Sequence, residues 1–235
     1  MHLVIANKLY SSWSMRPWLV MRAFDIPFTE TVIPLKQPDT ATRILAYSPT
    51  GKVPVLIDRS DVDCDAVVWE SLAIISYLAD RFPEKPMWPK GRGALAHAKA
   101  ISMEMHAGFQ ALRQTCPMNL GKRFAAPPMT DDLKANIHRL ETMWRDSRKR
   151  FGGGRGPFLF GHYTAADAMF APIVTRFDTY AIPVAADTRA YMTAVLAEPS
   201  FLEWKADAFR EPWRIPEYET GHAVIEVLAP EPATT

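Results

Sequence analysis

The stretch Thr50-Gly51-Lys52-Val53-Pro54-Val55-Leu56, together with Trp69-Glu70-Ser71-Leu72, decides how we interpret this chain. The first stretch opens on a turn and continues as an apolar, β-branched run typical of a strand. The second precedes apolar residues at helical spacing. We interpret the two stretches as a socket for a small peptide-like ligand, whose reactive atom meets a hydroxyl from the serine cluster Ser11-Ser12-Trp13-Ser14.

Hydrophobic periodicity divides residues 1–82 into alternating strands and helices. Short β-branched runs predict strands, and apolar residues recurring every three or four positions predict helices. The expected order is strand 3–6, helix 14–26, strand 28–33, short helix 40–46, strand 53–58, strand 66–69 and helix 70–82. This βαβαββα order is the pattern of a thioredoxin-like domain, in which helices flank a mixed sheet.

Three local details of this domain carry expectations of their own. The serine cluster lies where the first strand gives way to the first helix, and Ser14 is expected to cap that helix. Asp61 to Asp65 are expected to form an acidic turn between two strands. Pro54 cannot donate to a sheet ladder, so it belongs at the mouth of its strand. The Val53–Pro54 bond is either cis, which turns the Val53 backbone outward, or trans at the start of an edge strand.

Residues 83–93 hold three prolines and two glycines without apolar periodicity, which indicates a linker between domains. Residues 94–212 then carry helical periodicity, so we expect an all-helical bundle. Its first long helix is predicted over about 94–119 and another over about 131–150. Residues 213–235, rich in proline, glutamate, alanine and threonine, are expected to form a loosely held tail.

A short polar motif precedes the most apolar helix of this bundle. Thr164, followed three residues later by Asp167, resembles an N-terminal capping box in which aspartate replaces the usual glutamate. Because the helix beyond it is long and apolar, we expect it at the centre of the bundle, with the cap in a folding role.

Charge and cysteine content exclude several classes of function. The chain has 27 lysine and arginine residues against 26 aspartate and glutamate residues, a formal net charge of +1. No strong overall field draws such a protein to nucleic acid or to an anionic membrane. Cys64 and Cys116 are too few for a disulfide framework and have no metal-type spacing. With no signal-like or membrane-length apolar run, we expect a soluble cytoplasmic protein without a metal.

The predicted architecture, an α/β domain followed by an all-α domain, resembles that of the soluble glutathione transferases. The resemblance covers roughly residues 1–210. It rests on the order and spacing of four motifs: Ser11-Ser12-Trp13-Ser14-Met15-Arg16-Pro17, Lys52-Val53-Pro54-Val55-Leu56, Glu70-Ser71-Leu72-Ala73-Ile74 and Thr164-Ala165-Ala166-Asp167.

The resemblance implies that glutathione occupies the socket. The Val53 backbone would pair with the cysteinyl part of glutathione like an added strand, and Pro54 matches the family's cis-proline. Glu70 suits the ammonium group of the γ-glutamyl end, while Ser71 and the helix N-terminus suit its carboxylate. Lys52 would face the glycyl carboxylate. Taken alone, Ser71 would equally suit a helix cap and Lys52 a solvated surface.

The serine cluster resembles the serine-type branch of the family, and its spacing is closest to that of the zeta class, which includes maleylacetoacetate isomerases. A hydroxyl that donates to the glutathione sulfur favours the nucleophilic thiolate. Ser11 matches the zeta position with that role, and Ser12 lies beside it, so both are candidate catalytic residues. Tyr10 is a rival donor. Trp13 replaces the zeta cysteine and adds an aromatic wall to the substrate pocket.

The second substrate is expected between the two domains, against one side of the first long helix. His106, Gln110 and Arg113 fall at i, i+4 and i+7 on that helix, away from its apolar stripe. Arg113 suits an anionic cosubstrate. The alternative interpretation of these three residues is a solvated polar face.

We therefore expect a glutathione transferase that conjugates the thiolate to a small electrophile, hydrophobic or anionic. One alternative is a glutathione-dependent cis–trans isomerase of the maleylacetoacetate or maleylpyruvate type, for which glutathione is a regenerated cofactor. Another is a non-catalytic binding or assembly module of the same fold. The family resemblance implies a homodimer, with neither nucleic acid nor membrane as a partner.

Overall fold

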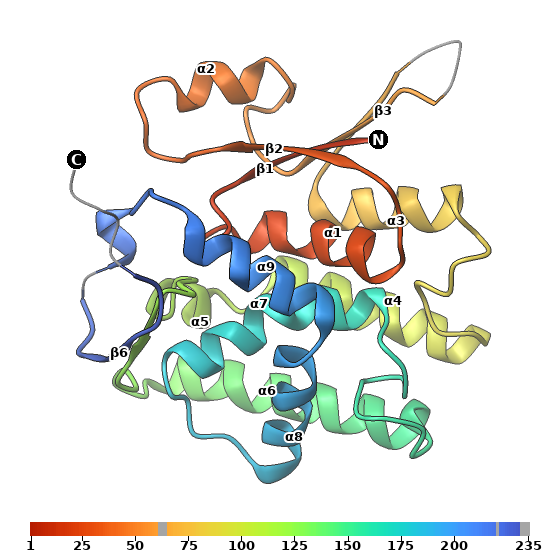
Figure 1. Cartoon of the computed structure of the whole chain (residues 1–235). Coiled ribbons are helices and arrows are strands. Elements are labelled where there is room, and N and C mark those ends of the chain that lie inside the picture. Colours follow the sequence, from red (N-terminus) through yellow and green to blue (C-terminus); the bar gives the residue numbers. More distant parts are fainter. Residues whose placement is uncertain (61–64, 220, 231–235) are drawn as a thin grey trace.

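The computed structural model describes residues 1–60, 65–219 and 221–230, and it has two parts (Figure 1). The N-terminal part holds a mixed sheet flanked by helices, and the C-terminal part is mostly helical, as the sequence predicts. Cys64 and most of the acidic turn predicted at Asp61 to Asp65 lie outside the described residues. In the described ranges, no helix is both long enough and apolar enough to cross a membrane.

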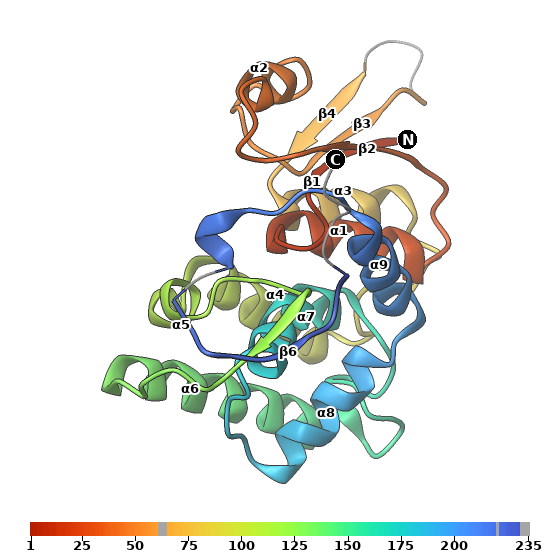
Figure 2. The ribbon, with the colours of Figure 1, turned by 60° about the vertical axis from the view of Figure 1, so that its left-hand side comes forward.

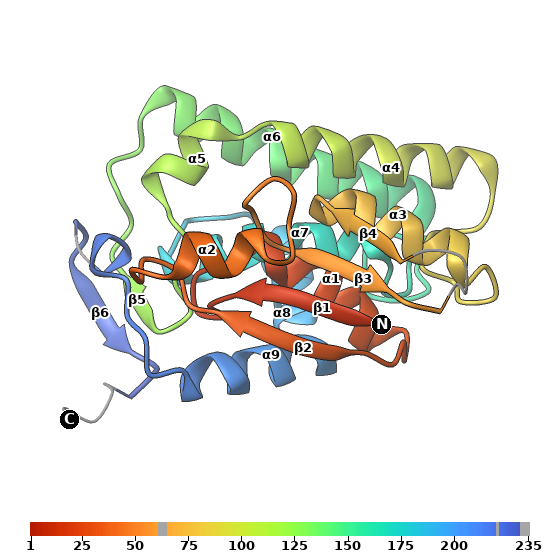
Figure 3. The same cartoon turned by 90° about the horizontal axis from the view of Figure 1, so that it is seen from above.

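The N-terminal elements follow the predicted βαβαββα order. They are β1 (His2–Ala6), α1 (Ser12–Ala23), β2 (Thr29–Ile33), α2 (Thr40–Leu45), β3 (Val55–Asp58), β4 (Ala66–Trp69) and α3 (Ser71–Arg81). The strand order is β2-β1-β3-β4, with β1 parallel to β2 and the other two pairs antiparallel (Figure 3). This mixed sheet confirms the predicted thioredoxin-like domain.

Helices cover both faces of the sheet (Figure 1, Figure 2). α2 lies on the outer face, whereas α1 and α3 lie between the sheet and the C-terminal helices. Successive residues of a strand point to opposite faces. Val4 and Val55 accordingly belong to the small apolar cluster at α2, while Ile5 and Leu56 belong to the large core shared with the C-terminal part.

The helices of the C-terminal part are α4 (Arg92–Ala107), α5 (Gln110–Thr115), α6 (Asp131–Ser147) with the π-helical turn η1 (Arg148–Gly152), α7 (Ala165–Thr179), α8 (Ala186–Leu196) and α9 (Pro199–Arg210). The loop between α3 and α4 contains most of the predicted linker. Every residue of α7 except Asp178 is buried, and this helix packs against α1, α4 and α8. The helix predicted at the centre of the bundle therefore lies there.

The Thr164–Asp167 capping box is formed at the start of α7. One oxygen of Asp167 accepts hydrogen bonds from the backbone N–H of Thr164 at 2.9 Å and from its hydroxyl at 2.8 Å. The other oxygen accepts from the Leu159 N–H at 3.1 Å and the Tyr191 hydroxyl at 3.2 Å. Burial raises the pKa of Asp167 to about 6, although these hydrogen bonds act in the opposite direction. The box thus anchors α7 to two neighbouring segments.

The first long helix, predicted over 94–119, is wrong in its extent, because the chain forms two helices there. α4 ends at Ala107 and α5 begins at Gln110. Between them Phe109 has a left-handed φ of 64°. A Cβ at Gly108 would lie 2.9 Å from the Glu104 carbonyl oxygen, so glycine permits the close turn. Apolar spacing that continues through Phe109 and Leu112 hid this break.

The segment expected to be a loosely held tail forms regular structure over part of its described length, although most of its described residues are exposed or half-buried. After the 3₁₀ turn η2 (Pro216–Tyr218), β6 (Val224–Val227) pairs antiparallel with β5 (Lys122–Phe124), as Figure 3 shows. Ile215 and Ala229 are buried. The expectation of an all-helical bundle therefore needs correction, because a two-stranded sheet joins positions about one hundred residues apart, which composition does not reveal.

Lys8 fixes the loop that leads from β1 to the serine cluster. Its buried ammonium group lies 2.7 Å from Glu30 and 2.6 Å from Asp207, and its carbonyl accepts a hydrogen bond from the Trp204 indole at 3.0 Å. The loop backbone also donates to Glu211. The start of α1 is thereby held against the end of α9.

Candidate functional site

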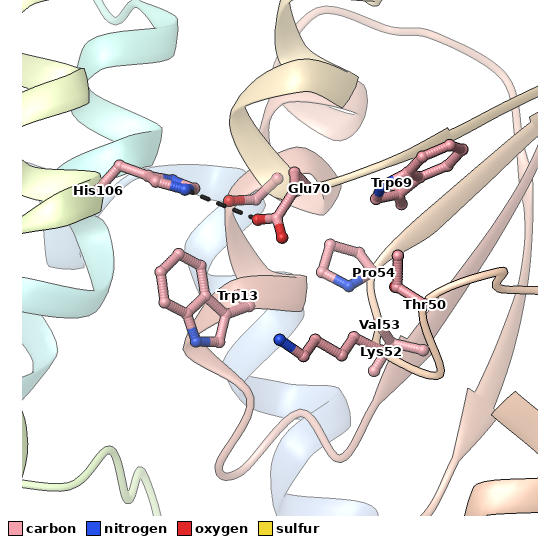
Figure 4. A pocket seen from close by; sticks show the side chains of 9 residues that line it. Trp13, Thr50, Lys52, Val53, Pro54, Trp69, Glu70 and His106 are labelled. Atoms are coloured by element: carbon pink, nitrogen blue, oxygen red, sulfur yellow. Dashed lines mark ion pairs between the residues drawn. The ribbon is translucent and has the colours of Figure 1, made fainter.

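A cavity of about 390 Å³, here called the first cavity, lies where the start of α1, the loop before β3, the start of α3 and α4 meet (Figure 4). In Figure 4 the Lys52 side chain extends toward Trp13, and the Glu70 carboxylate points into the space between neighbouring elements. The lining includes all five predicted socket residues and four others: Lys52, Val53, Pro54, Glu70, Ser71, Trp13, Thr50, Trp69 and His106.

The Val53–Pro54 peptide bond is cis, which decides between the two alternatives left open by the sequence. Val53 stands just before β3, whose first residue Val55 pairs with Val4 and Trp69. Within the described residues, no hydrogen bond occupies the Val53 amide or carbonyl. Free backbone groups beside a strand are suited to pair with an extended peptide.

Glu70 and Ser71 form the corner between β4 and α3. Glu70 has a φ of 69°, and its Oε2 lies 3.7 Å from His106 Nε2. Ser71 is the first residue of α3 and is fully buried, yet its hydroxyl has no partner in the described part of the chain. The alternative role as a helix cap does not apply, because α3 has no side-chain cap. A helix start with a spare hydroxyl is suited to bind a carboxylate.

Ser11, and not Ser14, caps α1, so the predicted cap is wrong. The helix begins at Ser12, and Ser11 Oγ accepts from the Ser14 N–H at 3.3 Å. The Ser11 hydroxyl donates to Ser14 Oγ at 2.8 Å, and the same oxygen accepts from the Ala6 N–H at 3.1 Å. Ser14 therefore ties β1 to the first turn of α1 from inside the helix.

A second cavity, of about 460 Å³, adjoins the first at the Trp13 ring, which lines both. Both candidate serines line it, whereas neither lines the first cavity. The full lining is Tyr10, Ser11, Ser12, Trp13, Leu35, Arg113, Gln114, Pro117, Met118, Arg176, Glu217 and Tyr218. Its walls combine aromatic and apolar side chains with two guanidinium groups.

Tyr10 lines the second cavity, but its hydroxyl is already engaged. It donates a short hydrogen bond to Glu219, which Lys122 and Asn119 also contact. Burial, followed by this hydrogen bond, raises the pKa of Tyr10 well above its ordinary value of 10. The hydroxyl of Tyr10 is therefore a poorer donor to a cavity ligand than those of the serines.

The three polar residues predicted on one helix face are not brought together. His106, on α4, lines the first cavity, and Arg113, on α5, lines the second. Gln110 is exposed and lines neither of these two cavities. The break at Gly108 separates them, because it ends the helical spacing on which the prediction depended.

Three guanidinium groups surround Trp13 and Ser12. Those of Arg16 and Arg113 lie 4.2 Å and 5.2 Å from the Trp13 ring centroid, and Arg176 Nη2 lies 3.4 Å from Ser12 Oγ. Among the described residues, none of the three forms an ion pair with a carboxylate. Burial and their mutual repulsion lower the pKa of Arg16 and Arg176, the latter to about 10. Positive charge therefore accumulates around Trp13 and Ser12.

Sequence reasoning missed Arg16 and Arg176 as site residues, although both left a signal. Arg16 stands within the Ser11–Pro17 motif. Arg176 is the single cation of a mostly apolar helix, between Thr175 and Phe177. A buried charge in such a setting needs polar partners, which makes it a candidate for a functional role.

The chain matches two family models that cover most of it. Residues 10–81 match the glutathione S-transferase N-terminal domain, and residues 123–210 match the glutathione S-transferase C-terminal domain. Glutathione S-transferase 1 of Dianthus caryophyllus is 34% identical over 164 residues, covering 68% of this chain and 70% of that protein. A probable maleylacetoacetate isomerase of Caenorhabditis elegans is 27% identical over 178 residues, covering 71% and 76%.

Solved structures with this fold include bacterial transferases. A glutathione transferase homologue from Burkholderia with bound glutathione has a TM-score of 0.64 at 19% identity, covering 88% of this chain and 96% of that one. A Burkholderia graminis transferase with two glutathione molecules per subunit has a TM-score of 0.64 at 18% identity, covering 89% of each chain. The family models and the Dianthus relative show that this chain belongs to the glutathione S-transferase family.

Proposed function

We propose that this transferase binds glutathione in the first cavity and joins its sulfur to a small electrophile held in the second cavity. The observation that carries the proposal is the fully buried Ser71 hydroxyl, which has no partner in the described part of the chain. An unpaired buried hydroxyl costs about 1–3 kcal/mol, so a ligand acceptor in the first cavity would relieve that cost. Related Burkholderia transferases crystallised with glutathione support this choice of ligand.

Each end of glutathione has a complementary group in the first cavity. Glu70 suits the ammonium group of the γ-glutamyl end, and Ser71 with the start of α3 suits its carboxylate. The free backbone groups of Val53 suit the cysteinyl peptide, and the exposed Lys52 suits the glycyl carboxylate. This arrangement directs the thiol toward Trp13 and the start of α1.

The chemistry requires a lowered thiol pKa and correct positioning. A serine hydroxyl at the start of α1 donates to the sulfur and stabilises the thiolate, while the thiol proton passes to solvent. The sulfur electron pair then forms a bond to an electrophilic carbon. In a substitution that carbon expels a leaving group with its bonding pair, and in an addition its double bond breaks and the neighbouring carbon accepts a proton from solvent. The second cavity holds that electrophile beside the sulfur.

Isothermal titration of glutathione tests the proposed binding site. Ser71→Ala is expected to weaken binding about tenfold or more, because it removes the hydroxyl that pairs with the ligand carboxylate. The matched control is Ser102→Ala, which removes a buried hydroxyl that donates to the Ala98 carbonyl and lines neither cavity. Equal affinity of the two variants would contradict the assignment.

The isomerase function is the second candidate, and the cations of the second cavity favour it. Arg113 and Arg176 line that cavity without carboxylate partners in the described chain, which suits an anionic substrate. Similarity to the Caenorhabditis elegans isomerase supports the same class. Incubation with maleylacetoacetate or maleylpyruvate decides the point: product without consumption of glutathione supports isomerisation, and no turnover excludes it for those substrates.

We also infer a homodimer, as the family resemblance implies, and a cytoplasmic location, which the low cysteine content favours. Light scattering coupled to gel filtration measures the mass in solution, and a mass near 53 kDa, twice the 26.5 kDa chain, is the expected result. A monomeric mass together with glutathione binding would contradict the proposed dimer but not the proposed binding site. A protein that does not bind glutathione would instead favour the non-catalytic module.

A further inference from the structure

We propose that Ser12, and not Ser11, donates the hydrogen bond to the glutathione sulfur, and that Arg176 is the positioning residue that orients the Ser12 hydroxyl. The inference rests on the proposed function, since it concerns the thiolate of bound glutathione. It departs from the family resemblance, which gives the zeta-class role to the position of Ser11.

Ser11 is committed to the structure of the first turn. Its oxygen accepts from the Ser14 N–H, and its proton goes to Ser14 Oγ at 2.8 Å. Ser14 Oγ is held in turn by the Ala6 N–H. To donate to a ligand, Ser11 would have to break the bond to Ser14, and that bond belongs to a network joining β1 to α1.

Ser12 has the opposite arrangement. Its oxygen accepts from Arg176 Nη2 at 3.4 Å, and within the described residues its proton has no acceptor. A donor that occupies the oxygen on one side leaves the O–H bond to point elsewhere. Because Ser12 is 5% exposed and lines the second cavity, the free direction is toward a ligand atom there.

The guanidinium of Arg176 is fixed independently of Ser12. Its Nε donates to the Cys116 carbonyl and its Nη1 to the Pro172 carbonyl, both at 2.9 Å. The side chain is 5% exposed and belongs to α7, the buried central helix. A group held by two carbonyls keeps its third donor aimed at Ser12 without an entropic cost at the moment of binding.

The charges around Ser12 also favour the thiolate form of bound glutathione. Arg16 and Arg113 are the other cations near Arg176, and the Cys116 thiol beside it is neutral because burial raises its pKa to about 12. Tyr180 and Tyr218 also face Arg176, whose pKa of about 10 leaves it charged at neutral pH. Glu70 is the carboxylate that faces Arg16. An excess of positive charge favours a thiolate over a thiol at this place.

The first test is the pKa of the thiol of bound glutathione, measured from thiolate absorbance against pH. Ser12→Ala is expected to raise that pKa by about one to two units, because it removes a hydrogen bond to a charged group. Ser11→Gly removes the other hydroxyl but keeps a residue tolerated at an N-cap, so the thiol pKa should stay near that of the unmodified protein. A larger shift in Ser11→Gly than in Ser12→Ala would overturn the proposal.

The second test is a double-mutant cycle between Arg176 and Ser12. Arg176→Met should raise the thiol pKa in the unmodified background but have a smaller effect after Ser12→Ala, because the hydroxyl it orients is gone and only the loss of its charge remains. Arg113→Met is the matched control, since Arg113 adds charge to the same cavity without contacting Ser12, and its effect should add to that of Ser12→Ala. Additive effects for Arg176 would overturn its positioning role.

Calorimetry with S-methylglutathione separates this inference from the proposed function. If the variants bind this thiolate-free ligand normally and Ser12→Ala leaves the thiol pKa unchanged, the inference alone is overturned. If the unmodified protein binds neither ligand, the proposed function fails with it. Because Arg176 is buried, Arg176→Lys serves as a second variant that keeps the charge, and a partial return of the low thiol pKa is the expected result.

Discussion

The two cavities share the Trp13 ring but are built in different ways. The first is shaped mainly by the backbone, through the cis Val53–Pro54 bond and the left-handed Glu70 at the start of α3. The second is shaped by side chains from distant parts of the chain, among them Tyr10, Arg176 and Tyr218. Backbone recognition suits a ligand that never changes, whereas a wall of side chains suits a substrate that differs between relatives.

The two cavities also differ in how their charged side chains are held. In the first cavity, Glu70 and Lys52 are exposed and available to the ligand. In the second, Arg176 is buried and held by main-chain carbonyls, and Arg113 is held by the carbonyls of Met105 and Gly108. Substitutions in the first cavity should therefore change glutathione affinity, and those in the second should change reactivity and electrophile selection.

The largest effect is expected from Asp167→Asn, which should destabilise the start of α7 beside the second cavity and leave the first cavity unchanged. Four groups now donate hydrogen bonds to the Asp167 carboxylate, and the side-chain amide of the variant would place a donor of its own among them. The free energy of unfolding should fall by about 2–3 kcal/mol as a result. The melting temperature should fall by about 5–10 °C. Since α7 carries Arg176, activity should suffer, while S-methylglutathione affinity of the folded variant should persist.

Asp178→Asn is the control for that prediction, because Asp178 lies at the other end of α7 and pairs with Arg123 at 3.2 Å on the protein surface. Its effect should stay below about 1 kcal/mol. Thermal melts of both variants, with and without S-methylglutathione, give the comparison. Equal melting temperatures would show that the capping box does not support the second cavity.

Glu70→Gln is expected to have the next largest effect, confined to the first cavity. It removes the carboxylate that we propose for the ligand ammonium group, so the dissociation constant of glutathione should rise about 10- to 100-fold. The KM for the electrophile should change little. Glu104→Gln on α4, which breaks an exposed pair with Arg139 on α6, is the control. Unchanged glutathione affinity in Glu70→Gln would show that Glu70 does not bind the ligand.

Arg113→Met should affect the second cavity in a way that depends on the charge of the electrophile. For an electrophile bearing a carboxylate, KM should rise about tenfold, because one charge-assisted contact is lost. For a neutral electrophile KM should be unchanged. Arg139→Met, on the surface of α6, controls for the general loss of positive charge. Equal changes for both electrophiles would mean that Arg113 does not contact the substrate.

The smallest effect is expected from the pair between His106 and Glu70, which links the two domains across the first cavity. Burial, then the Arg16 cation, lower the pKa of His106 below 6.5, while Glu70 raises it and Arg113 lowers it further. Below that pKa the imidazolium competes with the glutathione ammonium for Glu70. Affinity should thus fall by about two- to fivefold as pH drops toward 5.

Titrations at pH 7 and pH 5 with His106→Asn complete this comparison. The variant has no group to protonate at this position, so its affinity should depend less on pH than that of the unmodified protein. An equal pH dependence would assign the titration to another group in the first cavity.

Local chemistry explains which parts of the site the sequence could predict. Pro54 restricts the backbone at the start of its own strand. Ser71 follows a strand and begins a helix, and Thr164 with Asp167 forms a cap within four residues. In each case the determining contacts lie close together in the sequence. The thioredoxin-like order of the first domain was predictable for the same reason, since each element carries its own periodicity.

Long-range packing explains what was missed. Arg176 approaches Ser12 across 164 positions, and β6 pairs with β5 across about one hundred, so no local pattern indicates either contact. The break at Gly108 was hidden by apolar spacing that continues on its far side. The cap of α1 was misplaced because Ser14 is held by the Ala6 N–H, a contact that depends on how β1 lies against the helix.

A crystal structure of the protein with glutathione bound would show where each end of the ligand and its sulfur lie. We expect the γ-glutamyl carboxylate on Ser71, the cysteinyl peptide paired with Val53, and the sulfur within hydrogen-bond distance of Ser12 Oγ beside Trp13. Glutathione held against Ser11 with the Ser11–Ser14 bond broken, or bound away from Glu70 and Ser71, would contradict this expectation.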